Sequence, residues 1–290
     1  MSAFRFGTVG SPISTPKKPG GSVGGVLRLA EMGLTALELG WVQSVRVSEQ
    51  TCAEIRSAAE TNQVLVSVHA PYFINLNADE EEWPKSRKRL MDAAYFGNLA
   101  GATDIVFHPG SYFGKPAEEV LPLATLRLKG CTQELSEAGN PVVLRPETMG
   151  KSAMLGSFED TLVMSVELSK AGYSGVLPCL DFAHLHARAG DGSVNTYEEW
   201  MGILRSYREA LGEAALGNLH IHLSGIEYGE KGEKNHLTLE EADLDVHALF
   251  RALLDMGCAG RILCESPAME EDALKMQAIW KEVSGDGAGK

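Results

Sequence analysis

The sequence predicts a single α/β domain folded as a (β/α)8 (TIM) barrel. Its 290 residues are a normal length for one such barrel. Eight short segments rich in β-forming residues recur, with helix-like stretches after most of them, and eight is the strand count of a closed barrel. We expect the barrel to span 1–283 and a disordered tail to follow over 284–290. The expected strands are 4–10, 36–41, 64–72, 104–110, 142–148, 175–185, 219–225 and 261–267.

Amphipathic helices are expected between these strands. Residues 86–101 and 198–214 place apolar side chains at spacings of three and four, the period of one helix face. The glycine-rich stretch 19–25 matches neither a dinucleotide-binding nor a Walker motif, so we expect a loop that leads into a helix. The polar segment 227–237 predicts a long loop after the seventh strand, at the end of the barrel where barrel enzymes carry their chemistry.

The net charge of −13 has the wrong sign for a protein that grips a phosphate backbone along its whole surface. A local basic groove or a metal cluster that supplies positive charge stays compatible with it. The five cysteines form no CxxC pair, which favours reduced thiols and a cytoplasmic location over a disulfide framework. We expect no membrane association, because no apolar run approaches the roughly 20 residues that span a bilayer.

The expected strands three to eight each end in an imidazole or a carboxylate. One such histidine alone is usually a hydrogen-bonded core residue, and one such carboxylate often caps the next helix. Six successive strands that do this at one rim indicate a site, because burying these groups together costs too much free energy unless a cation neutralises them. Histidine, glutamate and aspartate are the ligands of zinc and similar ions. The predicted metal ligands at the C-terminal rim are His69, His108, Glu147, Asp181, His184, His222 and Glu265.

The order of these residues allows two metal ions. Four consecutive strands supply one complete ligand set, and the two preceding strands add His69 and His108, with Glu147 as a carboxylate that bridges both ions. Two ions that share a carboxylate are the usual apparatus for phosphodiester hydrolysis. The seventh strand carries two histidines, His220 and His222, on one face. We assign His222 to the metal because it lies nearer the rim, and His220 to packing or to a supporting hydrogen bond one layer lower.

Together these stretches resemble the endonuclease IV family of apurinic/apyrimidinic (AP) endonucleases, within the xylose-isomerase-like barrel superfamily, of which the chain looks like a divergent member. The resemblance implies a barrel with a three-zinc cluster that cuts DNA 5′ to an abasic site and leaves a 3′-hydroxyl. The matching pieces are HAPYFINL (69–76), FHPGS (107–111), PETMG (146–150), LDFAHLHARAG (180–190), HLSG (222–225) and CES (264–266).

The resemblance also implies which residues hold each ion. The first zinc takes the histidines of strands three and four together with the bridging glutamate, and the second takes that glutamate and the ligands of strands six to eight. The third takes one histidine after strand six and one in the 227–237 segment. In that order the sets are His69, His108 and Glu147; Glu147, Asp181, His222 and Glu265; and His184 with His236.

The third zinc of the family also needs an aspartate two positions before its last histidine, in an Asp-Arg-His pattern. Here that position is Lys234, which cannot ligate while protonated and whose charge repels a cation. Glu230, Glu233 or His186 could substitute, or Lys234 could contact phosphate in place of the lost metal. We therefore expect two Zn²⁺ ions, leave the third open, and regard Mn²⁺ as an alternative metal.

Three residues that follow the strand-three histidine lie on the loop that enters DNA in the family. Tyr72, Phe73 and Asn75 are therefore expected DNA contacts, since an aromatic side chain can fill a base-sized gap. The alternative is that this loop packs over the barrel mouth. Arg46, after strand two, is an expected phosphate contact.

The function that the resemblance implies is a zinc-dependent endodeoxyribonuclease of base excision repair, with Glu147, Asp181 and Glu265 as catalytic residues. Its partner would be duplex DNA with abasic sites, and we expect a monomer. The main alternative is a single-metal sugar isomerase or epimerase on the same barrel, which would leave His69 and His108 without a role. A third alternative, motivated by the lost ligand at position 234, is a non-catalytic protein that binds damaged DNA or a nucleotide.

Overall fold

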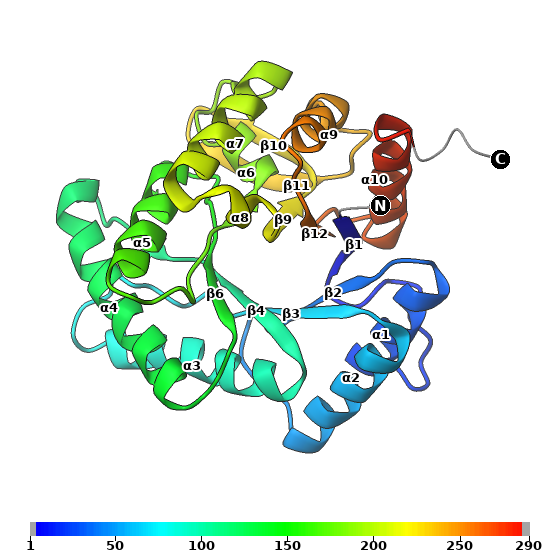
Figure 1. The fold of residues 1–290 in the computed structure, drawn as a ribbon, viewed down its shortest axis with the longest axis horizontal. Helices are drawn as coiled ribbons and strands as arrows, with labels where there is room; N and C mark the ends of the chain where they lie inside the picture. Colours follow the sequence, from blue (N-terminus) through cyan, green and yellow to red (C-terminus); the bar gives the residue numbers. More distant parts are fainter. Residues whose placement is uncertain (1–3, 286–290) are drawn as a thin grey trace.

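The computed structural model describes residues 4–285 and confirms the predicted (β/α)8 barrel. Eight parallel strands surround a central axis and the helices form an outer ring (Figure 1). The strands run in the order β6-β4-β3-β2-β1-β12-β9-β8, and isolated parallel bridges join β6 to the residues around β8, so the barrel nearly closes. These strands are β1 (Phe4–Val9), β2 (Ala36–Gly40), β3 (Leu65–His69), β4 (Ala102–Phe107), β6 (Val143–Pro146), β8 (Cys179–Asp181), β9 (Leu219–Leu223) and β12 (Gly260–Cys264).

The helices begin and end at recognisable local signals. Helix α7 starts with a capping box, in which Thr196 and Glu199 satisfy each other's backbone N–H, and it stops at Gly212, whose φ of 89° favours glycine. The helices are α1 (Gly21–Glu31), α2 (Glu49–Asn62), α3 (Trp83–Leu99), α4 (Ala117–Glu137), α5 (Phe158–Lys170), α6 (Phe182–Ala187), α7 (Tyr197–Leu211), α8 (Glu213–Leu216), α9 (Val246–Asp255) and α10 (Glu270–Val283).

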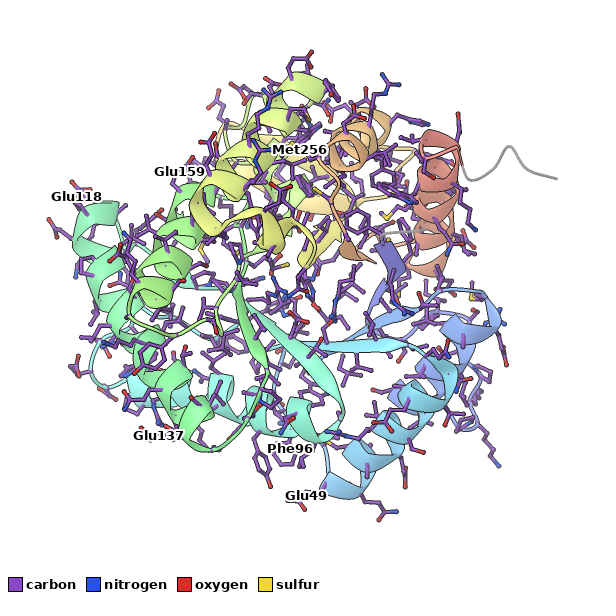
Figure 2. All side chains as sticks on the ribbon, viewed as in Figure 1. Glu49, Phe96, Glu118, Glu137, Glu159 and Met256 are labelled. Carbon is purple, nitrogen blue, oxygen red and sulfur yellow. The ribbon has the colours of Figure 1, made fainter. Side chains whose placement is uncertain are left out.

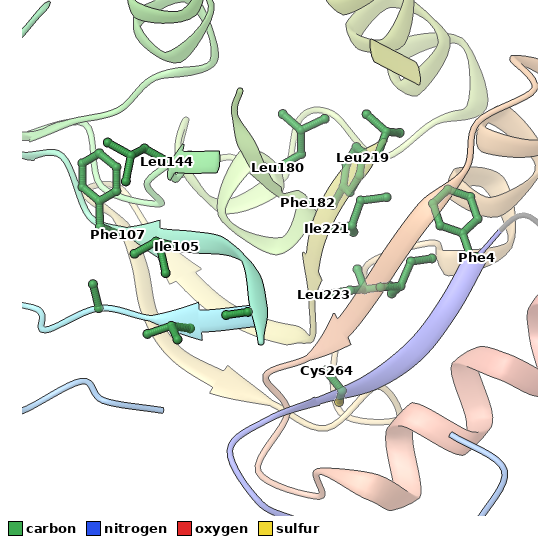
Figure 3. Close-up of a cluster of buried hydrophobic side chains, with 14 of the residues drawn as sticks. Phe4, Ile105, Phe107, Leu144, Leu180, Phe182, Leu219, Ile221, Leu223 and Cys264 are labelled. Atoms are coloured by element: carbon green, nitrogen blue, oxygen red, sulfur yellow. The ribbon is translucent and has the colours of Figure 1, made fainter. Parts of the chain in front are cut away.

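Side chains alternate between the two faces of the barrel strands. The apolar residues point outward and pack under the helices, as Ile105 and Phe107 of β4 and Ile221 of β9 do (Figure 3). Many of the alternate residues are buried and polar, among them Glu38 and His220, and Figure 2 shows nitrogen and oxygen atoms gathered inside the ring of strands. Most barrels fill this space with branched apolar side chains. The polar interior is therefore a property of this chain that calls for a chemical explanation.

Several expected elements have other boundaries in the structure. The expected strand 175–185 is short, because Asp181 caps α6 and the chain turns helical there. The segment 198–214 is divided at Gly212 into α7 and α8, and α1 begins inside the glycine-rich stretch 19–25. The polar segment 227–237 is a β-hairpin rather than a loop, formed by β10 (Gly225–Gly229) and β11 (Gly232–Leu237). A two-residue pair, β5 (Gly110–Ser111) and β7 (Met154–Leu155), also lies outside the barrel sheet.

Two expectations concern the ends of the chain and membranes. The expected disordered tail falls almost wholly on 286–290, which lie outside the described residues, and the domain boundary at 283 stays a prediction. Within 4–285, no helix is long and apolar enough to cross a membrane.

Candidate metal centre

The C-terminal rim of the barrel carries a pocket of about 340 Å³. Its walls come from loops after β3, β4, β6 and β8, from the hairpin β10–β11, and from the end of β12, so it lies where parallel-barrel active sites form. The pocket is large enough for one small ligand or one sugar-phosphate unit. It is lined by His69, Tyr72, His108, Met149, Lys151, Met154, His184, Glu233, His236 and Glu265.

One group of potential ligands brings together three predicted residues from β3, β4 and β6. His69 Nε2 and His108 Nε2 both lie 3.3 Å from the same oxygen, Glu147 Oε2. Two atoms that ligate a tetrahedral zinc at about 2.0–2.1 Å are themselves about 3.3–3.4 Å apart. The spacing of this group is therefore that of ligands around one ion.

A second group uses the other oxygen of the same glutamate. His222 Nδ1 lies 3.2 Å from Glu147 Oε1 and 3.5 Å from Glu265 Oε1. Asp181 completes the group from the end of β8. Because Oε1 and Oε2 of Glu147 face different histidines, this one carboxylate joins the two groups.

Buried polar atoms without hydrogen bonds show that these residues suit a cation. Within the described part of the chain, Glu147 Oε2, Asp181 Oδ2 and His184 Nε2 are buried and have no hydrogen-bond partner. Such atoms are costly unless something satisfies them. All three belong to the proposed ligand groups, and a divalent ion is the partner that His and carboxylate donors of this kind accept.

In two of these histidines, Nδ1 is anchored by a backbone carbonyl oxygen. Nδ1 of His69 donates to the carbonyl oxygen of Ala70 (2.9 Å), and Nδ1 of His184 donates to that of Thr148 (2.9 Å). These bonds fix the tautomer in which Nε2 carries a free lone pair, the form that binds a metal. Histidines that ligate metals characteristically have such partners.

A third group lies at the edge of the pocket and includes a residue that the family pattern does not contain. His184 Nε2 lies 3.5 Å from Glu233 Oε2, and His236 completes the group. Glu227 pairs with Asn235 but Tyr228 pairs with Glu233, so Lys234 is an extra residue in β11, a β-bulge. The bulge reverses the alternation of side chains and brings residues 233 and 236 to one face.

The structure separates Glu233 from the other substitutes considered for the third site. Lys234 points away and forms an exposed ion pair with Glu227, at 3.2 Å between Nζ and Oε1. Glu230 is exposed at the hairpin turn. His186 is buried on α6, and its Nε2 lies 3.1 Å from Asp243 Oδ1. Of the four, Glu233 alone shares a potential ligand group with His184 and His236.

The protonation states of the potential ligands depend on one another. Burial alone would raise the pKa of Glu147, but the imidazoles of His222 and His108 hold it well below its usual range. Burial would lower the pKa of His184, but Asp181, Glu147 and Glu233 raise it to about 9. The raised pKa values of His184 and His222 mean that protons on these two imidazoles balance the carboxylates when no cation is present, so a metal would have to displace them on binding.

The expected DNA-binding residues are distributed differently. Tyr72 and Phe73 are 45% and 57% exposed on the loop after β3, and the ring of Tyr72 stacks on His108 at 4.9 Å between centroids. Asn75 uses its side chain within the loop, where Oδ1 accepts the backbone N–H of Asn77 at 2.8 Å. Arg46 is exposed after β2. Of this set, Tyr72 borders the pocket, and Phe73 is exposed on the same loop with the guanidinium of Arg89 over its ring.

Sequence reasoning missed Glu38 and Lys151. Glu38 lies in the middle of β2, wholly buried, and its Oε1 is 2.9 Å from His222 Nε2. A carboxylate in the interior of an otherwise apolar strand was the signal that could have identified it. Lys151, in the loop after β6, lines the pocket, and no local pattern distinguishes it from other exposed lysines.

This fold and this site define a class of protein. It is a nearly closed parallel barrel, and its rim gathers imidazoles and carboxylates that could hold divalent ions. The xylose isomerase-like TIM barrel family matches residues 26–283, and the chain belongs to that family. Within it, the chain is a divergent relative of endonuclease IV.

Relatives fall into several groups. An uncharacterized protein of Methanocaldococcus jannaschii is 36% identical and covers 96% of this chain and 97% of its own length. Endonuclease 4 of Thermus thermophilus is 29% identical, and the match covers 90% of this chain and 94% of that protein. Among solved structures, endonuclease IV from Thermus thermophilus superposes with a TM-score of 0.71 at 23% identity (98% and 100% covered), and a D-tagatose 3-epimerase-like protein with 0.72 at 18% (99% and 100%). At these identities the structural likeness concerns the fold.

Proposed function

We propose that the protein is a metal-dependent phosphodiester hydrolase that nicks duplex DNA 5′ to abasic sites. The observation that carries the proposal is the pair of histidines placed 3.3 Å from Glu147 Oε2, because it adds a second ion position beside the Glu147–Asp181–His222–Glu265 group. A single-metal mechanism has no use for it. The relationship to endonuclease 4 supports the same reading.

The residues have distinct tasks in this proposal. Metal ions bound here would lower the pKa of a water molecule and stabilise negative charge on phosphate oxygens. Glu147 fixes the spacing of the two ion positions through its two oxygens. Asp181 directs Oδ2 into the site while Oδ1 accepts the N–H of His184 (2.8 Å), which fixes the carboxylate plane. Glu265, which borders the pocket, is placed to accept a proton from the attacking water.

The loop after β3 supplies the contact with DNA. Tyr72 borders the pocket and Phe73 is exposed on the same loop, and an aromatic side chain there can occupy the gap left by a missing base. Lys151 is a cation at the pocket wall suited to a flanking phosphate. Bound divalent ions add positive charge at the rim, which offsets the repulsion expected from the net charge of −13.

A third ion would be held by His184, Glu233 and His236, with Glu233 in place of the aspartate that the family pattern requires and this chain lacks. The bulge at Lys234 compensates for the changed spacing, since it lets ligands three positions apart share a face. His236 is oriented for this task, because its Nδ1 lies 2.7 Å from Ser224 Oγ and leaves Nε2 free.

Replacing Glu233 tests this third position. We expect Glu233→Gln to lose one metal ion per chain in elemental analysis and to nick about 10²-fold more slowly, the scale of losing one charge-stabilising group. Glu230→Gln is the matched control, an exposed glutamate of the same hairpin, and should behave like the native protein. Equal metal content in both variants would remove Glu233 from the ligand set.

The decisive test is incubation with a duplex oligonucleotide that carries one tetrahydrofuran abasic analogue. We expect a single nick 5′ to the analogue in the presence of Zn²⁺, Mn²⁺ or Co²⁺, and none after EDTA treatment. An undamaged duplex of the same sequence is the control. Absence of nicking with all three metals would refute the proposed activity.

The alternative with structural support is a sugar epimerase, because the four-residue group around Glu147 and Glu265 could hold one ion and the pocket of about 340 Å³ would enclose one ketose. Epimerase structures share the fold. Incubation of D-fructose with the Mn²⁺-loaded protein distinguishes the two. Product formation with a single bound ion per chain would favour the epimerase over the nuclease.

A further inference from the structure

A fully buried carboxylate lies beneath the metal-ligand groups, and neither the proposed chemistry nor the family resemblance uses it. Glu38 is on β2, whose other residues are apolar or glycine. Its Oε2 accepts a hydrogen bond from Ser67 Oγ at 2.7 Å and lies 2.9 Å from His220 Nε2. Its Oε1 lies 2.9 Å from His222 Nε2.

These contacts cross the inside of the barrel. In the sheet order, β1 and β12 separate β2 from β9, so Glu38 and the two histidines of β9 meet through the interior and not along a strand pair. Glu38, His220 and His222 are all buried. An ionised carboxylate at such a place costs several kcal/mol unless its partners are fixed, so its presence points to a specific task.

The two ring nitrogens of His222 face different partners. Nδ1 points to Glu147 and Glu265, at 3.2 and 3.5 Å, and Nε2 points to Glu38. Within the described residues, Glu38 Oε1 and His222 Nε2 are both buried, and no hydrogen bond satisfies either atom, although the two lie 2.9 Å apart. A proton on Nε2 shared with this carboxylate leaves Nδ1 with the lone pair that a metal ion requires.

We infer that Glu38 is a positioning residue for the metal centre: it holds His222 in the Nε2–H tautomer and aims Nδ1 at the ion position. Ser67 and His220 hold Glu38 in turn. This inference rests on the proposed role of His222 as a metal ligand. It explains why His220, one layer below the rim, is a histidine rather than an apolar residue.

The experiment compares zinc affinity in the native protein, Glu38→Gln and Glu38→Asp, measured by competition with a chromophoric chelator. Loss of a carboxylate that orients a ligating histidine weakens metal binding by about 10–100-fold. We expect that loss for Glu38→Gln and partial recovery for Glu38→Asp, which keeps the charge. Asp160→Asn is the matched control, because this buried carboxylate binds Tyr112 and the backbone of Ser157 and touches no proposed ligand.

Two further measurements separate positioning from stability. Long-range ¹⁵N–¹H correlation spectra of the zinc-loaded protein should show the Nε2–H form of His222 in the native protein and a mixture of Nε2–H and Nδ1–H forms in Glu38→Gln. In a His222→Asn background, Glu38→Gln should cause no additional loss of zinc affinity, whereas a merely structural role would give additive losses.

The outcomes are distinguishable from a failure of the proposed function. Unchanged zinc affinity in Glu38→Gln, with the native protein binding zinc, would overturn the role of Glu38 and leave the metal centre intact. If the native protein binds no zinc at this site, both proposals are wrong. If Glu38→Gln fails to fold, Glu38→Asp and the tautomer of His222 decide the question.

Discussion

Glu147→Gln should abolish the activity and empty the metal centre. The amide cannot offer two anionic oxygens, so His69 and His108 lose their shared partner on one side and His222 on the other. Charge stabilisation by the ions is worth several kcal/mol, which corresponds to a loss of about 10³-fold or more in rate. The measurements are single-turnover nicking of the abasic duplex and metal content per chain.

The control for this variant is Glu227→Gln, at an exposed glutamate of the neighbouring hairpin that pairs with Lys234. Exposed pairs of this kind contribute little, so metal content and rate should stay at native values. If Glu147→Gln retained native metal content, the shared-carboxylate arrangement would have to be abandoned. Retained activity with lost metal would contradict the metal-dependent chemistry itself.

Asp104→Asn should lower the free energy of unfolding by about 3–5 kcal/mol, because removing one partner of a buried ion pair leaves uncompensated charge. Asp104 lies inside the barrel and binds two buried guanidinium groups: Arg145 through Nε and Arg261 through Nη2, at 2.8 Å for the latter. Both arginines would lose their anion. Urea denaturation at pH 7 measures the difference.

The pH dependence of this effect has a defined sign. Burial opposes ionisation of Asp104, but Arg145 and Arg261 outweigh it and hold the pKa well below its usual range. A depressed folded-state pKa stabilises the protein fully above the unfolded-state value of about 3.9, and the contribution declines as the pH falls below it. The difference in the free energy of unfolding between the native protein and Asp104→Asn should therefore stay roughly constant from about pH 5 to 7 and shrink below about pH 4.

Asp92→Asn provides the comparison, since Asp92 pairs with Lys88 on the exposed surface of α3. Its effect should stay within about 0.5 kcal/mol. A loss below about 1 kcal/mol for Asp104→Asn would mean that water or rearranged groups satisfy the two arginines. The interior charges would then be no major source of stability.

Local pattern predicts much of the candidate site because parallel strands deliver their last residues to one rim. His69, His108, Glu147 and His222 were identified in this way, and the structure brings them together. Glu233 could not be singled out from sequence, because its orientation depends on a one-residue bulge that only the pairing of β10 with β11 reveals. Spacing along the sequence does not distinguish Glu230 from Glu233 as a potential ligand.

The sequence by itself determined the barrel and the residues that reach its rim. Strand count, alternation of side chains and segment spacing are local properties, and they leave one architecture for this chain. Tertiary structure alone decided which groups meet across the interior. The contacts that turn Nε2 of His222 to Glu38 and Nδ1 to Glu147 depend on the stagger of strands far apart in the chain, which no local pattern encodes.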